Sequence, residues 1–98
     1  MEMITIVAKF KIKPECIEAF KKAAVVVARA TRKERGNLSY RIYQGRNDAT
    51  EFTFLEEWLN DVVIEDHNKM SHFKTFIDTI TPMCEQEVSI EQIMTIPN

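Results

Sequence analysis

The chain has 98 residues, of which 45% are hydrophobic and 29% charged, with a formal net charge of −2 and a pI near 5.7. A chain of this length supports one hydrophobic core, so we expect a single domain over residues 1–98. The weakly acidic balance gives no reason to expect nucleic acid or an anionic membrane as a partner. No apolar run reaches the roughly 18 residues of a membrane-spanning helix, and the absence of a signal-like N-terminal block predicts a cytoplasmic protein.

The cysteine and histidine content argues against a metal cluster. Cys16 and Cys84 lie far apart and form no CxxC pair, and the chain has only two histidines. These residues do not assemble a zinc site at the usual spacings. We therefore expect no metal and two reduced thiols, since a cytosolic chain rarely keeps a disulfide.

The first predicted element is a strand over residues 3–12, in which hydrophobicity alternates. Its apolar face consists of Ile4, Ile6, Ala8, Phe10 and Ile12. The opposite face is also largely apolar in its first half, so both faces are expected to be covered. A helix should begin near Pro14, and Gly36 and Asn37 are expected to close it. Its apolar stripe consists of Ile17, Phe20, Ala24, Val27 and Thr31.

Residues 38–44 and 51–58 are predicted to form a hairpin, because two strand-like segments flank a short run of turn residues. One face of the first strand consists of Leu38, Tyr40 and Ile42. One face of the second strand consists of Phe52, Phe54, Glu56 and Trp58.

Two short helices and a last strand complete the prediction. Asn60 is a suitable N-cap for a helix over residues 61–70, and Ser71 for a second helix that stops at Thr81 and Pro82. The apolar stripe of the second helix consists of Phe73, Phe76, Ile77 and Ile80. Residues 88–96 alternate again and predict the last strand.

The predicted order is β-α-β-β-α-β, the split-βαβ or ferredoxin-like arrangement of the α+β class. Such a domain has an antiparallel sheet with helices on one face. The apolar residues on both faces of the first strand indicate that the other face is covered too. A second copy of the chain is the simplest cover, so we expect a homodimer in which two sheets pack into a dimeric α/β barrel.

Four segments carry a family resemblance. They are residues 36–44 (GNLSYRIYQ), residues 54–58 (FLEEW), Asp66 with His67, and residues 71–74 (SHFK). In this order they resemble the antibiotic biosynthesis monooxygenase family, and the likeness extends over residues 4–80. The resemblance implies a dimeric α/β barrel with a ligand cavity between sheet and helices in each subunit.

The family fixes the fold better than the reaction. It includes quinol monooxygenases that use molecular oxygen without flavin, haem or metal, an isomerase of the phosphorylated autoinducer-2 signal, and haem-degrading relatives. The haem-degrading relatives use an asparagine on the first strand, where this chain has ITIVA at residues 4–8. The resemblance therefore favours cofactor-free oxidation of a quinol or polyphenol, with an aromatic substrate and oxygen as partners.

Such a reaction requires a dry, aromatic-lined cavity with one or two polar groups that take a proton from the substrate. His67 and Trp58 are the predicted catalytic residues. The predicted substrate-binding residues are Tyr40, Phe52, Phe54, Phe73 and Phe76. Apolar helical neighbours should lower the pKa of His67 and suit it to act as a neutral base. The alternatives are a structural His67 bonded to a backbone carbonyl and a Trp58 that is only core.

The remaining polar residues are assigned to other places. Glu57 is expected to pair with Arg41 or to lie at the subunit interface, and His72 to cap a helix or lie on the surface. Two other functions stay open. One is an isomerase of a small phosphorylated sugar, for which Arg41, Arg46 or Lys69 could hold the phosphate although no glycine-rich loop is present. The other is a non-catalytic dimeric protein that binds a small ligand.

Overall fold

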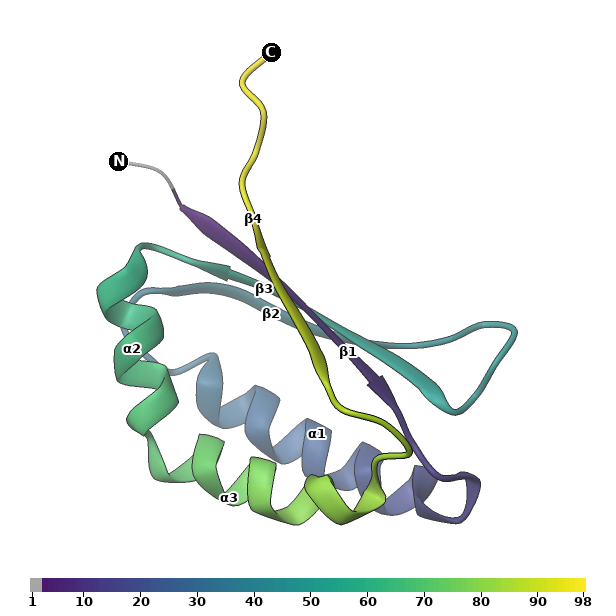
Figure 1. The fold of residues 1–98 in the computed structure, drawn as a ribbon. Helices are drawn as coiled ribbons and strands as arrows, with labels where there is room; N and C mark the ends of the chain where they lie inside the picture. Colours follow the sequence, from purple (N-terminus) through teal and green to yellow (C-terminus); the bar gives the residue numbers. More distant parts are fainter. Residues whose placement is uncertain (1–2) are drawn as a thin grey trace.

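The computed structural model describes residues 3–98 as a four-stranded sheet with its helices packed on one face (Figure 1). The strands are β1 (Ile4–Lys11), β2 (Asn37–Gln44), β3 (Glu51–Trp58) and β4 (Ser89–Ile93). The α-helices are α1 (Ile17–Thr31), α2 (Asp61–Lys69) and α3 (Ser71–Ile80). Short 3-10 turns, η1 (Pro14–Cys16) and η2 (Thr81–Met83), precede α1 and follow α3. No helix within residues 3–98 is long and apolar enough to cross a bilayer.

The sheet has the strand order β2-β3-β1-β4, and all three neighbouring pairs are antiparallel. Ile4 lies opposite Trp58 and Lys11 opposite Glu51, so β1 and β3 pair along their whole lengths in the centre of the sheet. This order and the placement of the helices confirm the predicted ferredoxin-like α+β fold.

Aromatic rings make up much of the core between sheet and helices. The alternation of β1 directs Ile6 and Phe10 inward, as predicted, and both are buried. The ring centroid of Phe10 lies 4.6 Å from that of Phe54 and 5.3 Å from that of Phe20. Phe76 of α3 meets Phe54 at 5.8 Å. Tilted pairs at these distances pack tightly, so the helices are held firmly on the inner face of the sheet.

Leu38 is the exception on the inner face predicted for β2. Its exposed fraction is 52%, whereas Tyr40 is buried. The pairing of β2 with β3 shifts register between Asn37 and Ser39. A bulge of this kind breaks the two-residue alternation, which removes Leu38 from the face that Tyr40 occupies.

Three predicted boundaries are wrong. The first helix ends at Thr31, and residues 32–36 form a separate turn in which Gly36 adopts a φ of +89°. Ser71 is the first residue of α3 rather than its cap, because the N-cap is Met70 and makes no side-chain capping bond. The last strand covers only Ser89–Ile93, and the chain beyond it extends away from the sheet (Figure 1).

Asn60 caps α2 as predicted, and its replacement should measurably weaken the fold. Its side-chain oxygen accepts a hydrogen bond from the backbone N–H of Val63 at 3.0 Å. Asn60→Ala is expected to lower the free energy of unfolding by about 1 kcal/mol, because the first turn of α2 loses this acceptor. Urea denaturation measures the loss. Asn60→Asp keeps the acceptor and serves as the control, and an equal loss in both variants would contradict the capping role.

Candidate functional site

A cavity of about 130 Å³ lies between the inner face of the sheet and helices α2 and α3. Its aromatic lining consists of Phe10, Tyr40, Phe54, Phe73 and Phe76. Its other polar lining residues are Glu56, His67, Asn68 and Gln92. Asn68 of α2 and Gln92 of β4 are exposed, so the cavity reaches the surface on the β4 side. The site is thus an apolar pocket with a few polar groups.

The structure brings five of the seven predicted site residues to this cavity. They are Tyr40, Phe54, His67, Phe73 and Phe76. Phe52 instead packs against Phe20, with ring centroids 4.6 Å apart, and lines a different hollow beside α1. Trp58 is fully buried and does not line the cavity. It contacts the cavity residue His67, with ring centroids 4.7 Å apart.

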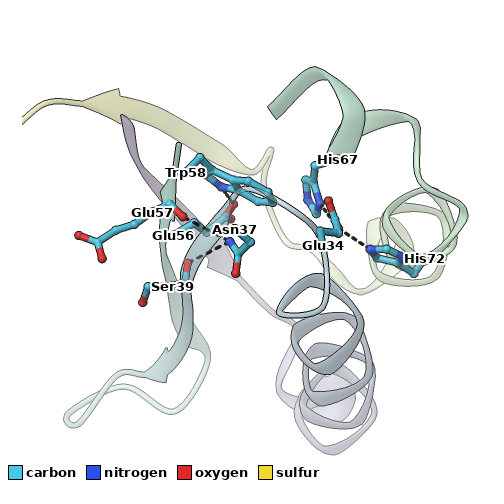
Figure 2. Close-up of polar contacts among 8 residues, drawn as sticks. All are labelled: Glu34, Asn37, Ser39, Glu56, Glu57, Trp58, His67 and His72. Atoms are coloured by element: carbon cyan, nitrogen blue, oxygen red, sulfur yellow. Dashed lines mark hydrogen bonds and ion pairs between the residues drawn. The ribbon is translucent and has the colours of Figure 1, made fainter. Parts of the chain in front are cut away.

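Trp58 holds a buried carboxylate, that of Glu56. Both side chains lie on the inner face of β3, and the indole Nε1–H donates a hydrogen bond to Glu56 Oε1 at 3.0 Å (Figure 2). The exposed fraction of Glu56 is only 6%. Burial raises the pKa of Glu56 to about 7, against the opposing effect of the Trp58 hydrogen bond, and the negative charge of Glu34 adds to the rise. Sequence reasoning placed Glu56 on this face but gave it no role.

Tyr40 contributes a hydroxyl that stays protonated. Burial raises its pKa strongly, and the charges of Glu56 and Glu34 raise it further. A phenol of this kind can donate a hydrogen bond but cannot act as a base near neutral pH.

His67, near the end of α2, packs against aromatic side chains. Its ring centroid lies 4.7 Å from Trp58 and 4.6 Å from Phe73. Its Nδ1 lies 2.7 Å from Glu34 Oε2, so the partner is a carboxylate and not the backbone carbonyl considered above. Burial lowers the pKa of His67, and the hydrogen bond to Glu34 opposes this effect. The expected direction of the pKa shift is therefore confirmed.

Glu34 is the site residue that sequence reasoning missed. It lies in the turn between α1 and β2, yet its side chain is only 5% exposed. Its backbone N–H donates to the carbonyl of Thr31 at 2.9 Å, and its carbonyl accepts from the N–H of Asn37 at 3.2 Å. These bonds fix the backbone on both sides of Glu34 and direct its carboxylate to the helices (Figure 2).

The prediction that His72 caps a helix or lies on the surface is wrong. Its Nε2 lies 2.6 Å from the same oxygen of Glu34 that His67 approaches, and its side chain is 24% exposed. An ionised carboxylate only accepts hydrogen bonds, so both imidazoles donate to it. One possible metal-ligating atom from each of Glu34, His67 and His72 lies within 4.8 Å of the other two. Within residues 3–98, this is the group of side chains that could hold a metal ion.

The expected pair of Glu57 and Arg41 is not formed: among residues 3–98, neither side chain makes an ion pair. The two residues lie on adjacent strands, on the face of the sheet opposite to the cavity, with Arg41 opposite Leu55 rather than Glu57. Their side chains therefore take no part in the cavity.

Comparison with known proteins confirms the resemblance carried by the four segments. The sequence model of the family described as "Antibiotic biosynthesis monooxygenase" matches residues 3–79. The "Putative monooxygenase YcnE" of Bacillus subtilis is 32% identical over 75 residues, which cover 76% of this chain and 79% of that protein.

Solved structures agree with this assignment. A conserved protein from Methanosarcina mazei Go1 has a TM-score of 0.93 at 28% identity, over 98% of this chain and 95% of the other. The PA3566 protein from Pseudomonas aeruginosa has a TM-score of 0.93 at 26% identity, over 99% and 97% of the two chains. The match of family, relative and fold shows that this monooxygenase-like chain belongs to the antibiotic biosynthesis monooxygenase family.

Proposed function

We propose that the protein is a cofactor-independent monooxygenase that oxidises a small quinol or polyphenol with molecular oxygen. The observation that carries the proposal is a buried carboxylate, Glu56, in an aromatic cavity, with its pKa raised to about 7. A base with a pKa near the working pH is suited to remove the proton of a phenolic hydroxyl. The apolar walls would exclude water from the anion that results.

The size of the cavity favours a substrate with one aromatic ring. Its volume of about 130 Å³ is close to the roughly 150 Å³ of an engineered protein cavity that binds benzene. Phe54, Phe73 and Phe76 supply aromatic faces against which such a ring can pack. No Lys or Arg is among the residues that line this cavity, so the alternative of a phosphorylated substrate has less support than an uncharged aromatic one.

The proposed reaction begins with transfer of the phenolic proton to Glu56, which the Trp58 indole N–H positions. The quinol anion, now electron-rich, transfers an electron to oxygen, and the two radicals combine to form a carbon–oxygen bond. Loss of water from the peroxide then yields a hydroxyquinone. One oxygen atom enters the product and the other leaves as water, with all four electrons supplied by the quinol. Tyr40 would donate a hydrogen bond to a substrate oxygen. The Nε2 of neutral His67, whose Nδ1 is engaged with Glu34, would accept one from a substrate hydroxyl.

Oxygen uptake by the metal-free protein with single-ring quinols and naphthalenediols tests this proposal. The rate should exceed the autoxidation blank and rise with pH through about 7 as Glu56 loses its proton. Glu56→Gln should lower kcat/KM by about 10²- to 10⁴-fold, the usual effect of losing a general base. Trp58→Phe should move the inflection of the pH profile to higher pH. The Trp58 hydrogen bond lowers the pKa of Glu56, so its loss lets this pKa rise.

Glu57→Gln is the matched control, because it makes the same chemical change on the next residue, whose side chain points to the opposite face of β3. It should leave oxygen uptake unchanged. Uptake no faster than the blank with every quinol, or equal loss in both glutamine variants, would contradict the proposed role of Glu56.

We also propose that the working form is a homodimer. Helices cover only one face of the sheet (Figure 1). Large apolar side chains are exposed on and after the edge strand β4, namely Ile90, Ile93, Met94 and Ile96. Apolar groups gathered in this way commonly mark an interface. Sedimentation at micromolar concentration should give twice the mass of one chain, and a monomer would contradict the expectation.

A further inference from the structure

We propose that Glu34, His67 and His72 form a binding site for one divalent transition-metal ion. The three side chains come from the turn after α1, the end of α2 and the start of α3. Both imidazoles approach the same oxygen of Glu34, Oε2 (Figure 2). Two imidazole nitrogens and a carboxylate oxygen are the donor set of many catalytic zinc sites and of the iron facial triad. This inference goes beyond the proposed oxidation, which requires no metal.

The charge of the cluster supports the proposal. Glu34 carries a carboxylate that is 5% exposed, and the ion pairs it makes within residues 3–98 are to the two histidines alone. A carboxylate buried in this way is costly unless it is paired, hydrogen-bonded or bound to a metal ion. A divalent cation between the three side chains would supply such a partner.

The cluster is built before any ion arrives. The backbone of Glu34 is fixed by the hydrogen bond that its N–H donates to Thr31 and the one that its carbonyl accepts from Asn37. A turn at Met70 joins α2 to α3 and places His67 and His72 on either side of the carboxylate, with ring centroids 6.1 Å apart. Ligands held in place in this way lose little conformational freedom on binding, which favours affinity.

The geometry requires only a small opening of the cluster. The two nitrogens lie 2.7 and 2.6 Å from the carboxylate oxygen. Tetrahedral ligands at 2.0–2.1 Å from an ion are about 3.3 Å apart. Each nitrogen must therefore move about 0.6 to 0.7 Å further from the carboxylate oxygen for the hydrogen-bonded cluster to become a coordination sphere. His72 also lines a surface groove between α1 and α3, which gives an ion a path from solvent.

Bound metal would act on the cavity through His67. The ion takes Nδ1, the nitrogen that now meets Glu34, so the proton of the neutral ring resides on Nε2. His67 also lines the cavity. The ion would therefore fix His67 as a hydrogen-bond donor and hold its ring between Trp58 and Phe73.

Titration of the chelator-treated full chain with Zn²⁺, followed by calorimetry and by imidazole NMR, tests the site. The chain has only two histidines, so each imidazole signal reports on one ligand. We expect one Zn²⁺ per chain and shifts of both imidazole signals. Glu34→Gln should weaken binding by at least about 100-fold, since even outer partners of metal ligands are worth 10- to 100-fold.

Glu65→Gln is the matched control, because Glu65 is an exposed carboxylate on α2, close to His67 in sequence. It should bind Zn²⁺ as tightly as the unaltered chain. Absence of saturable binding, or binding that leaves both imidazole signals unshifted in the unaltered chain, would overturn the proposal and leave a cluster held by hydrogen bonds alone. The unaltered chain supplies this second test even if Glu34→Gln fails to fold. Oxygen uptake in excess chelator reports on the proposed oxidation separately.

Discussion

Gly36→Ala is expected to lower the free energy of unfolding by about 3 kcal/mol, the combined effect of backbone strain and overpacking. Gly36 adopts a φ of +89°, a backbone conformation that residues other than glycine rarely adopt. A Cβ at this position would lie 2.4 Å from Val63 Cγ1 and 2.7 Å from Val63 Cβ. Glycine is therefore required here both by the backbone and by the close approach of α2.

The position links the parts of the candidate site. Gly36 ends the turn that carries Glu34, and its carbonyl accepts a hydrogen bond from the N–H of Leu59 at 2.9 Å, next to Trp58. Val63 is one helical turn before His67 on α2. A methyl group at Gly36 would push α2 away, so we expect the His67–Glu34 hydrogen bond to be weakened as well.

Urea denaturation of Gly36→Ala, Val63→Ala and the double variant measures what the Val63 methyl groups contribute. In the double variant the clash with these methyl groups is removed, but the close approach of the Cβ of residue 63 and the backbone strain remain. We therefore expect the second substitution to recover part of the loss, giving a coupling of about 1 kcal/mol or more between contacting residues. Strictly additive losses would show that the close approach to the Val63 methyl groups costs nothing.

The sheet and its helices could be predicted because local patterns report them directly. The alternation in β1 and in β3 identifies the buried face of each strand. The helical spacing of Phe20, Ala24 and Val27 does the same for α1. Neither pattern requires knowledge of the element packed against it. The exposure of Leu38 was not predicted, because a bulge is a property of the pairing of two strands. The alternation within one strand does not encode it.

The candidate site was predicted less completely, for a physical reason. His67 and the aromatic residues were identified from faces of single elements together with the family resemblance. Glu34 lies in the charged run RKER at residues 32–35, which has the composition of a solvated turn. Its burial depends on two histidines from other segments, and a contact between residues so distant in sequence leaves no local signal.

Glu56 should make the stability of the protein depend on pH in the direction opposite to most carboxylates. Its pKa is raised from the ordinary 4.5 to about 7 in the folded state, mainly by burial. Below pH 4.5 both states hold the proton. Between pH 4.5 and 7 the unfolded chain releases the proton while the folded chain keeps it, so stability falls as pH rises. Above pH 7 the loss is complete, at about 3 kcal/mol for this shift.

Glu56→Gln should remove this dependence, because its amide stays uncharged while its oxygen can still accept the Trp58 N–H. The free energy of unfolding of the variant, measured in urea relative to the unaltered chain at equal protein concentration, should rise by about 3 kcal/mol between pH 4.5 and pH 8. Other titrating groups cancel in this difference, and Glu57→Gln controls for the loss of a carboxylate from β3. A difference that stays constant across this range would mean that the Glu56 carboxylate is not penalised by burial. The cavity would then lack the poised base on which the proposed oxidation depends.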